Sequence, residues 1–461
     1  MKKIKLLVVF LAVLASSCGN YGNGELTGPE DRERWFTTDP YGMKFIKMGT
    51  YNMGGNDQDV PWAMTAQAKT VSIPPFWMDE TEITNNEYRQ FVRWVRDSLA
   101  RMMLGIEFEE DFLYTEDENG ELIEPPFINW ETPIDWKDPE YAMLLEELYL
   151  SENERFYRRK EIDTRKLNYT YWWVDLKQAA KKFNFDGDIR HHYNEESQRY
   201  TGQVRNERGE MVDVVDRSAF IMKDVINVYP DTLCWIADFT YSFNEPMTNA
   251  YFWHPSYDHY PVVGVNWKQA TAFCRWRTQL QNGYIRSQGG SFVQDYRLPL
   301  ESEWEYAARG GQDLSMYPWG GYYTRNYLGC FLANFKPMRG NYVDDGGIYT
   351  VPVASFEPND FGLYDMAGNV AEWTSNAFSE SAYSFMHDLA PDYQYDAQSD
   401  DAWTLKRKAI RGGSWKDIGY YLQNGIRSYE YQDTAKSYIG FRCVRSFLGR
   451  DINDAGGNQV Y

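Results

Sequence analysis

The clearest helical pattern lies near the start of the chain, where apolar and polar positions alternate with the period of a helix. Tyr88, Phe91, Val92 and Val95 recur at the spacing i, i+3, i+4, i+7, which places them on one face. Thr84 and the glutamate at position 87 have the spacing of a capping box, in which each side chain bonds the backbone of the other. This pattern predicts an amphipathic helix that begins just after Thr84.

Elsewhere the apolar runs are short and separated by turn residues. Strands are predicted around Val71–Ile73 and Tyr169–Val174, and a hairpin is predicted over Val204–Val215, where Arg208-Gly209 forms the turn. Helices are predicted over Ala270–Arg277 and Glu301–Arg309. Short strands, few long helices and many Gly- and Trp-containing loops indicate much irregular structure.

The first residues have the pattern of a lipoprotein signal peptide, predicted over 1–17. Three lysines precede the apolar run Leu6–Ala15, which is too short to cross a bilayer as a helix. The run ends Leu14-Ala15-Ser16-Ser17-Cys18, which resembles a bacterial lipobox. We therefore expect lipid on Cys18 and a flexible tether over 18–34. Gly19, with no Asp at that position, implies by resemblance to bacterial lipoproteins a location at the periplasmic face of the outer membrane. Ordinary signal cleavage, with Cys18 incidental, is the alternative.

Composition and charge narrow the class of partner. The 461 residues contain 47 Lys+Arg against 67 Asp+Glu, a formal net charge of −20, which disfavours binding to nucleic acid or to an anionic lipid surface. Aromatic residues make up 17% of the chain, enough for a substantial core. The five cysteines show no zinc-type spacing.

Eight blocks, in order, resemble the formylglycine-generating enzyme (sulfatase-modifying factor) family. They are Phe45–Gly49, Phe76–Asn85, Tyr260–Trp267, Arg297–Gly311, Tyr317–Gly320, Gly362–Trp373, Arg411–Trp415 and Gly440–Cys443. The resemblance implies a C-type-lectin-like α+β domain over 35–96 plus 259–446. A large α/β insertion would occupy 97–258 and a tail 447–461.

The resemblance also indicates which chemistry is missing. Catalytic family members use two cysteines after the Gly-Gly-Ser-aromatic block to bind copper, and thiolates suit Cu(I). Asp417 and Leu422 stand at those positions, so we expect no copper and no enzyme activity. The glutamates and arginines at 303, 305, 309 and 411 are expected to form a structural charge network rather than a catalytic one. The tryptophans at 267, 304 and 373 are expected in the core rather than in a ligand site.

Two calcium sites are implied by the same family pattern. The first maps onto Asn334, Phe335, Asp345 and Gly347, and the second onto Asp365, Gly368, Val370 and Glu372. Carboxylate, amide and backbone carbonyl oxygens are ligands that calcium prefers. The alternative is that these turns hold themselves by hydrogen bonds without an ion.

The family pattern further implies a disulfide between Cys274 and Cys443, which an oxidising periplasm would favour. Two buried thiols are the alternative. Cys234 and Cys330 have no assigned partner.

The lipobox, the phrase Trp77–Tyr88 and the long insertion together resemble the GldK/PorK-type lipoproteins of the type IX secretion and gliding machinery. GldJ-type lipoproteins are the nearest alternative. The resemblance implies a non-catalytic component that forms a ring with a GldN/PorN-like periplasmic partner, and we expect the insertion to contribute contacts there. An enzyme or a lectin-like binding protein with an unrecognised site is the alternative function.

Overall fold

The structure is a computed structural model that describes residues 39–55, 68–116, 120–180, 192–194, 199–201, 203–206, 208, 210–214, 217–238, 245–337 and 341–449. The chain divides into two units, Pro40–Phe447 and a second made of Met1–Asp39 with Leu448–Tyr461. The account below concerns the first unit. The predicted signal peptide, Cys18 and the whole predicted tether over 18–34 lie outside the described residues.

Helix α2 (Asn85–Leu104) begins where the sequence predicts. The Thr84 hydroxyl accepts from the amide of Glu87, and the Glu87 carboxylate accepts from the Thr84 amide, completing the capping box. The apolar face of α2 is buried, from Tyr88 to Leu104. The helix therefore runs eight residues past the expected domain border at residue 96, because buried side chains continue along its last two turns.

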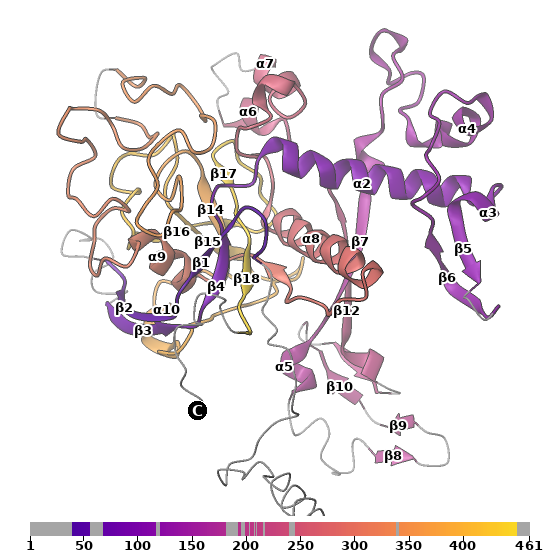
Figure 1. The fold of residues 1–461 in the computed structure, drawn as a ribbon, viewed down its shortest axis with the longest axis horizontal. Coiled ribbons are helices and arrows are strands. Elements are labelled where there is room, and N and C mark those ends of the chain that lie inside the picture. The colour runs from indigo at the N-terminus through magenta and orange to yellow at the C-terminus, as the bar shows by residue number, and fades with distance from the viewer. Residues whose placement is uncertain are drawn as a thin grey trace, which may run out of the picture. The chain divides into compact units, whose positions relative to one another are not determined.

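Two four-stranded sheets form the centre of the unit (Figure 1). The first has the order β1-β4-β18-β13 and is antiparallel throughout, and the second has the order β16-β15-β14-β17 with β14 and β17 parallel. Their strands are β1 (Met43–Ile46), β4 (Phe76–Asp79), β13 (Tyr296–Arg297), β14 (Ala371–Ala377), β15 (Arg407–Arg411), β16 (Ser428–Tyr431), β17 (Ile439–Gly440) and β18 (Val444–Ser446). The ribbon β2 (Gly49–Met53) and β3 (Lys69–Ile73) packs on α9 (Glu301–Arg309).

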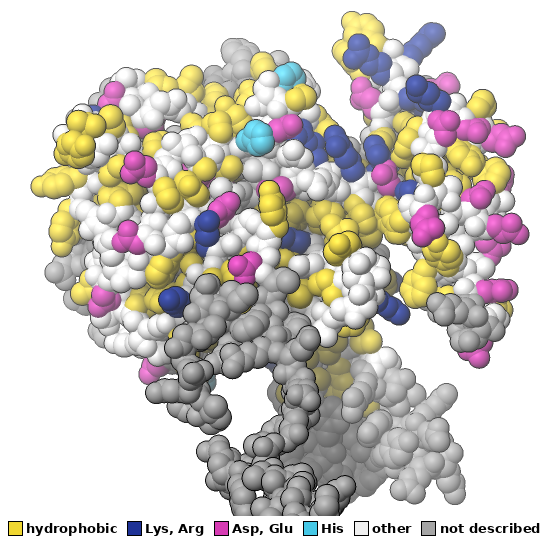
Figure 2. Space-filling model, viewed as in Figure 1, with side chains coloured by type: hydrophobic (Ala, Val, Ile, Leu, Met, Phe, Trp, Pro, Cys, Tyr) yellow, Lys and Arg dark blue, Asp and Glu magenta, His cyan; other side chains and the backbone are white. Residues whose placement is uncertain are grey.

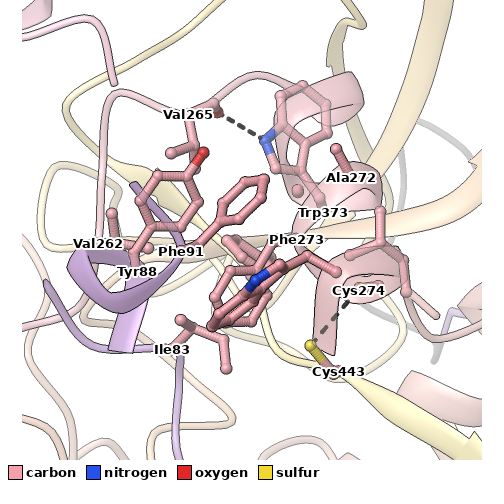
Figure 3. Packing of buried hydrophobic residues seen from close by; sticks show 14 of the residues in the cluster. Ile83, Tyr88, Phe91, Val262, Val265, Ala272, Phe273, Cys274, Trp373 and Cys443 are labelled. Atoms are coloured by element: carbon pink, nitrogen blue, oxygen red, sulfur yellow. Dashed lines mark hydrogen bonds between the residues drawn. The ribbon is translucent and has the colours of Figure 1, made fainter. Parts of the chain in front are cut away.

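Helix α8 (Trp267–Ser287) packs against α2, and the main core lies between these helices and the sheets (Figures 1 and 3). The ring of Tyr88 stacks on that of Phe273 at 5.5 Å between centroids, and Phe91 meets Phe273 edge-on. Trp373 is fully buried and donates from its indole nitrogen to the carbonyl of Val265. Trp304 is also fully buried. The expectation that the tryptophans lie in the core is confirmed for Trp304 and Trp373, whereas Trp267 is only partly buried against it.

The insertion is built from short elements. They are α3 (Glu109–Phe112), β5 (Leu113–Glu116), β6 (Leu122–Ile128), α4 (Pro139–Leu144), β7 (Asn168–Val174), α5 (Leu176–Ala179), β8 (His192–Asn194), β9 (Arg199–Thr201), β10 (Gln203–Arg205), β11 (Met211–Asp213), β12 (Ile221–Asn227), α6 (Cys234–Ala237) and α7 (Glu245–Ala250). A further short helix, α10 (Ala382–Phe385), follows β14. Pairing of β10 with β11 gives the hairpin that the sequence predicts, and β7 is the predicted strand.

Part of the insertion belongs to the main core. Strands β7 and β12 pair along seven residues, and the inward face of β7 buries Tyr169 and Tyr171 against α2 and α8. The hairpin β5–β6 instead packs on the last turns of α2, where Phe112 covers Leu104. Among the described residues, no helix is both long enough and apolar enough to span a membrane.

Candidate functional site

A tight glycine turn follows β15. By resemblance, catalytic members of the family have their active site next to this turn. Gly412 and Gly413 have φ values of 90° and 65°, and a Cβ on Gly413 would lie 2.8 Å from the carbonyl oxygen of Tyr421. Only glycine adopts this backbone without strain. The turn borders a cavity of about 180 Å³ lined also by Asp417, Tyr429 and Tyr438.

The two residues at the positions of the catalytic cysteines face different surroundings. Leu422 is fully buried in an apolar cluster with Met316, Tyr317 and Phe335. Asp417 accepts a hydrogen bond of 2.6 Å from the Ser414 hydroxyl, and burial raises the pKa of its carboxyl group. A carboxylate and a leucine offer no soft ligand for copper.

Buried ion pairs involve Arg411, the residue that directly precedes the turn. Arg411 is fully buried, donates to Glu305 at 2.8 Å and forms an ion pair with Glu301, whose carboxylate oxygen lies 3.0 Å from its Nε. Arg309 binds the other oxygen of Glu305, and Arg427 binds Glu301. The glutamate at 303 pairs instead with the arginine at 297. The expected structural charge network is confirmed for Glu305, Arg309 and Arg411, whereas Glu303 belongs to the separate pair with Arg297.

The structure brings the first expected calcium set together. The carboxylate of Asp345 accepts from the amides of Phe335, at 2.7 Å, and of Gly347, at 3.2 Å. A Cβ on Gly347 would lie 2.7 Å from the amide oxygen of Asn334, so this oxygen sits directly over the Gly347 backbone. Burial raises the pKa of Asp345. One carboxylate, one side-chain amide oxygen and backbone carbonyl oxygens are the kinds of ligand that an oxygen-seeking cation binds.

The second set lies next to the first. Asn369 connects the two sets, because its backbone N–H donates to the backbone carbonyl of Asn334. One oxygen of Asp365 accepts from the amide of Ala354, while the other is buried and has no hydrogen-bond partner in the described part of the chain. A buried carboxylate oxygen without a donor fits a cation site. Glu372 is already bonded by Arg442 and by the indole of Trp304.

Glu82 completes this region and was missed from the sequence. Its two oxygens accept from the side-chain amide of Asn369, at 2.7 Å, and from the backbone of Val370, at 3.1 Å. Burial, and then the carboxylates of Asp365 and Glu372, raise its pKa well above the usual range. Its partners Asn369 and Val370 lie far along the chain, so the local sequence around Glu82 carries no signal that could have found it.

These three buried carboxylates surround one buried cation, Arg442. The Arg442 guanidinium binds both oxygens of Glu372 at 2.6–2.9 Å. Burial raises the pKa of Asp365 to about 6. Within the described residues, no three His, Cys, Asp or Glu side chains lie close enough to hold a metal by themselves. A calcium ion here would therefore depend on amide and carbonyl oxygens as well as on carboxylates.

Cys274 on α8 and Cys443 before β18 lie together in the core. Their sulfur atoms are 3.5 Å apart, in hydrogen-bond contact and not joined by a disulfide (Figure 3). Both are buried, as is Cys234, whereas Cys330 is exposed. The contact makes the predicted pairing of Cys274 with Cys443 sterically accessible, and Cys234 and Cys330 keep no assigned partner.

Comparison with known proteins identifies the fold family. The model of the "Sulfatase-modifying factor enzyme 1-like domain" matches residues 32–447. The "Inactive C-alpha-formylglycine-generating enzyme 2" of Bos taurus is 34% identical over 191 residues, covering 40% of this chain and 50% of that protein. The "Formylglycine-generating enzyme" of Streptomyces coelicolor is 33% identical over 190 residues, covering 40% and 52%. The chain thus spans about half the length of these relatives.

The solved structure of PvdO from Pseudomonas aeruginosa aligns over 88% of this chain and 94% of its own, with 16% identity and a TM-score of 0.43. The family includes both active and inactive members by description. The extent of the family match and the mixed helix and strand content confirm the expected α+β fold. The chain belongs to the sulfatase-modifying factor family, the superfamily of the formylglycine-generating enzymes.

Proposed function

We propose that this chain is a non-catalytic member of its family that serves as an assembly component. The observation that carries the proposal is the burial of Leu422, at 0% exposure, in an apolar cluster where catalytic relatives by resemblance place a copper-binding cysteine. Asp417 at the other position is held by Ser414. Relatives in cattle and mouse that are described as inactive support a family role without catalysis.

The proposed setting is the type IX secretion and gliding machinery. The lipobox ending at Cys18 favours a lipid anchor at the periplasmic face of the outer membrane. By resemblance to GldK/PorK-type lipoproteins, the chain would associate with copies of itself and with a GldN/PorN-like protein in a ring. The acidic balance of the chain suits a partner with basic surface.

The β5–β6 hairpin is the part of the insertion that best fits a partner contact. Leu122 and Phe127 are 75% and 62% exposed, and Tyr114, which pairs with Phe127 across the strands, is 44% exposed. Acidic side chains gather on the same part of the surface, around α3, β5–β6 and α4 (Figure 2). Exposed aromatic groups ringed by charge are typical of protein interfaces.

The test is a pull-down of the tagged, full-length chain from membranes of its host, with mass spectrometry of the proteins that co-purify. We expect secretion or gliding components with the wild type, and loss of most of their yield with the double variant Leu122→Ser, Phe127→Ser. The control is Tyr284→Ser, which removes a 68% exposed aromatic group from α8. Recovery of no such components with the wild type would refute the assembly role.

A second arm tests for the alternative, an enzyme. The purified chain is incubated with copper and a cysteine-containing sulfatase peptide, and a hydrazide probe reports aldehyde. We expect no aldehyde above a protein-free control. Aldehyde formed in proportion to the chain would show that catalysis proceeds without the cysteine pair.

Structural calcium belongs to the same proposal. Asn334, Phe335, Asp345 and Gly347 would hold one ion, with the side chains of Asn334 and Asp345 as the polar anchors. Asp365, Gly368, Val370 and Glu372 would hold the other. Bound calcium would neutralise buried carboxylates, and these residues would then fix the loops around Asn369 in one arrangement.

A further inference from the structure

A second cavity, separate from the one at the glycine turn, lies between the insertion and the family domain. It has a volume of about 190 Å³. The insertion contributes residues of the β7–β12 ribbon, and the domain contributes residues of α8, β15 and the segment 394–396. An engineered apolar cavity of about 150 Å³ is large enough for benzene. The space therefore takes a ligand with about one ring.

Flat aromatic side chains form its walls. Trp173 stands on the inward face of β7, and its ring stacks on Tyr171 at 5.5 Å between centroids. Trp267, at the start of α8, is held by a hydrogen bond of 2.8 Å from its indole nitrogen to the carbonyl of Thr374. The ammonium group of Lys408 lies 3.9 Å from the centre of the Trp267 ring. These fixed faces suit stacking against a planar apolar group.

The charged groups of the lining are mostly cations, although the whole chain carries −20. Five basic side chains line the cavity, against two carboxylates, those of Asp224 and Asp396. Both carboxylates pair with one of the five, Arg208, at 3.4 and 3.0 Å. Arg208 compensates one of these two negative charges, and Arg297 is paired with Glu303, so Lys268, Arg275 and Lys408 give the lining its positive excess.

Two of the remaining cations pair with carboxylates that are about half exposed to solvent. Arg275 pairs with Asp295, whose side chain is 58% exposed, and Lys268 pairs with Asp433, whose side chain is 49% exposed. Such exposed pairs contribute little to stability, so either cation can turn its N–H groups to a buried anion at small cost. The lining thus combines apolar faces with spare positive donors.

We propose that this cavity binds a ligand that joins one planar apolar ring to a carboxylate. The ring lies between the faces of Trp173 and Trp267, and the carboxylate accepts from Arg275 and Lys268. The same chemistry is offered by a free aromatic acid and by an aromatic residue at the C-terminus of a peptide. Because the insertion supplies Trp173 and Arg208, the site exists only where the insertion packs on the domain.

The test is a titration of the full chain with three small probes, followed by ligand-observed NMR or calorimetry. Phenylacetate carries both groups, phenylacetamide has the same shape without the charge, and acetate has the charge without the ring. We expect phenylacetate to bind about tenfold or more tightly than either, since a charge-assisted hydrogen bond contributes about 1.5–3 kcal/mol. Equal binding of phenylacetate and phenylacetamide would overturn the role of the cations, and absence of phenylacetate binding would overturn the site.

Neighbouring residues supply matched variants. Trp173→Ala should weaken phenylacetate binding about three- to tenfold, the range for lost aromatic contacts. Trp172→Ala, on the opposite face of the same strand and 58% exposed, should leave it unchanged. Likewise Arg275→Gln should weaken binding, whereas Arg286→Gln, exposed on the same helix, should not. Equal effects within either pair would contradict the proposal.

A second pair of probes separates the two sources of the carboxylate. The peptide acetyl-Ala-Ala-Phe is compared with its C-terminal amide and with phenylacetate. Tighter binding of the peptide acid than of phenylacetate assigns the site to a chain end, and weaker binding assigns it to a free acid. Loss of binding by the amide is expected in both cases, and retention would contradict the proposal.

Discussion

Replacing Arg411 by methionine should cost more stability than any exposed substitution in the domain. The guanidinium is fully buried and donates to the carboxylate of Glu305 and to the backbone carbonyls of Asn424 and Ile426, at 2.8–3.0 Å, and it forms an ion pair with Glu301 at 3.0 Å. Methionine fills much of the same volume but donates nothing. The substitution therefore leaves buried acceptors without their partner while keeping the packing.

The size of the effect follows from what remains after the change. Breaking a buried ion pair by removing one partner typically costs about 3–5 kcal/mol. In the variant Glu305 still pairs with Arg309 and Glu301 still pairs with Arg427. The cost of breaking the ion pairs should therefore lie near the lower end of that range. The two carbonyls and the hydroxyl of Tyr383, which also accepts from the guanidinium at 2.8 Å, add to it. We expect a loss of about 4 kcal/mol in the free energy of unfolding.

Urea denaturation followed by far-ultraviolet circular dichroism measures this loss. The control is Arg325→Met, which breaks a pair with Asp344 whose side chains are 49% and 44% exposed, and should change stability by less than about 1 kcal/mol. Adding Glu305→Gln to Arg411→Met should cost less than the sum of the single changes, because the two groups interact. A loss below about 1 kcal/mol for Arg411→Met would refute the view that this network stabilises the turn.

Three further results are expected. After chelation, added calcium should raise the thermal midpoint of the wild type, and Asp365→Asn should reduce the increase; an equal increase in both would argue against this ligand. Non-reducing peptide mapping of the chain isolated under oxidising conditions should find Cys274 joined to Cys443, and Cys443→Ser should lower the free energy of unfolding by about 2–5 kcal/mol. Alkylation of Cys274 in the native chain would exclude the bond. Burial raises the pKa of Asp417, so its contribution to stability is complete below pH ~4 and is lost as the pH rises through the raised pKa. The urea midpoint of the wild type should therefore fall between about pH 4 and pH 7, and Asp417→Asn should make this fall less steep. An unchanged slope would contradict this.

Local patterns predicted the local structure well. The capping box at Thr84 and Glu87, the apolar face of α2 and the helix Glu301–Arg309 all rest on contacts between residues close in sequence. The same holds for the β10–β11 hairpin. Periodicity and turn residues predict such elements because the contacts that form them join residues close in sequence.

Long-range polar contacts could not be predicted in the same way. Glu82 bonds to Asn369 across 287 residues of sequence, and nothing near Glu82 marks it as a buried acceptor. The domain border expected at residue 96 falls inside α2 for a related reason. The last turns of this helix are buried by Phe112 and Leu145, which come from a segment that the sequence presented as separate. Tertiary packing decides such boundaries, not helix propensity.

The role of the insertion must be tested by surface changes rather than by removal. Strand β7 places Tyr169 and Tyr171, 5% and 6% exposed, in the same core as Phe91 and Trp276. Deleting residues 104–250 would expose that core, and lost binding would then report misfolding. Each large buried side chain contributes about 1.5–3 kcal/mol, so two of them approach the whole stability of a typical domain. Substitutions at exposed positions of β5–β6 leave this core intact, so loss of a partner there is evidence of an interface.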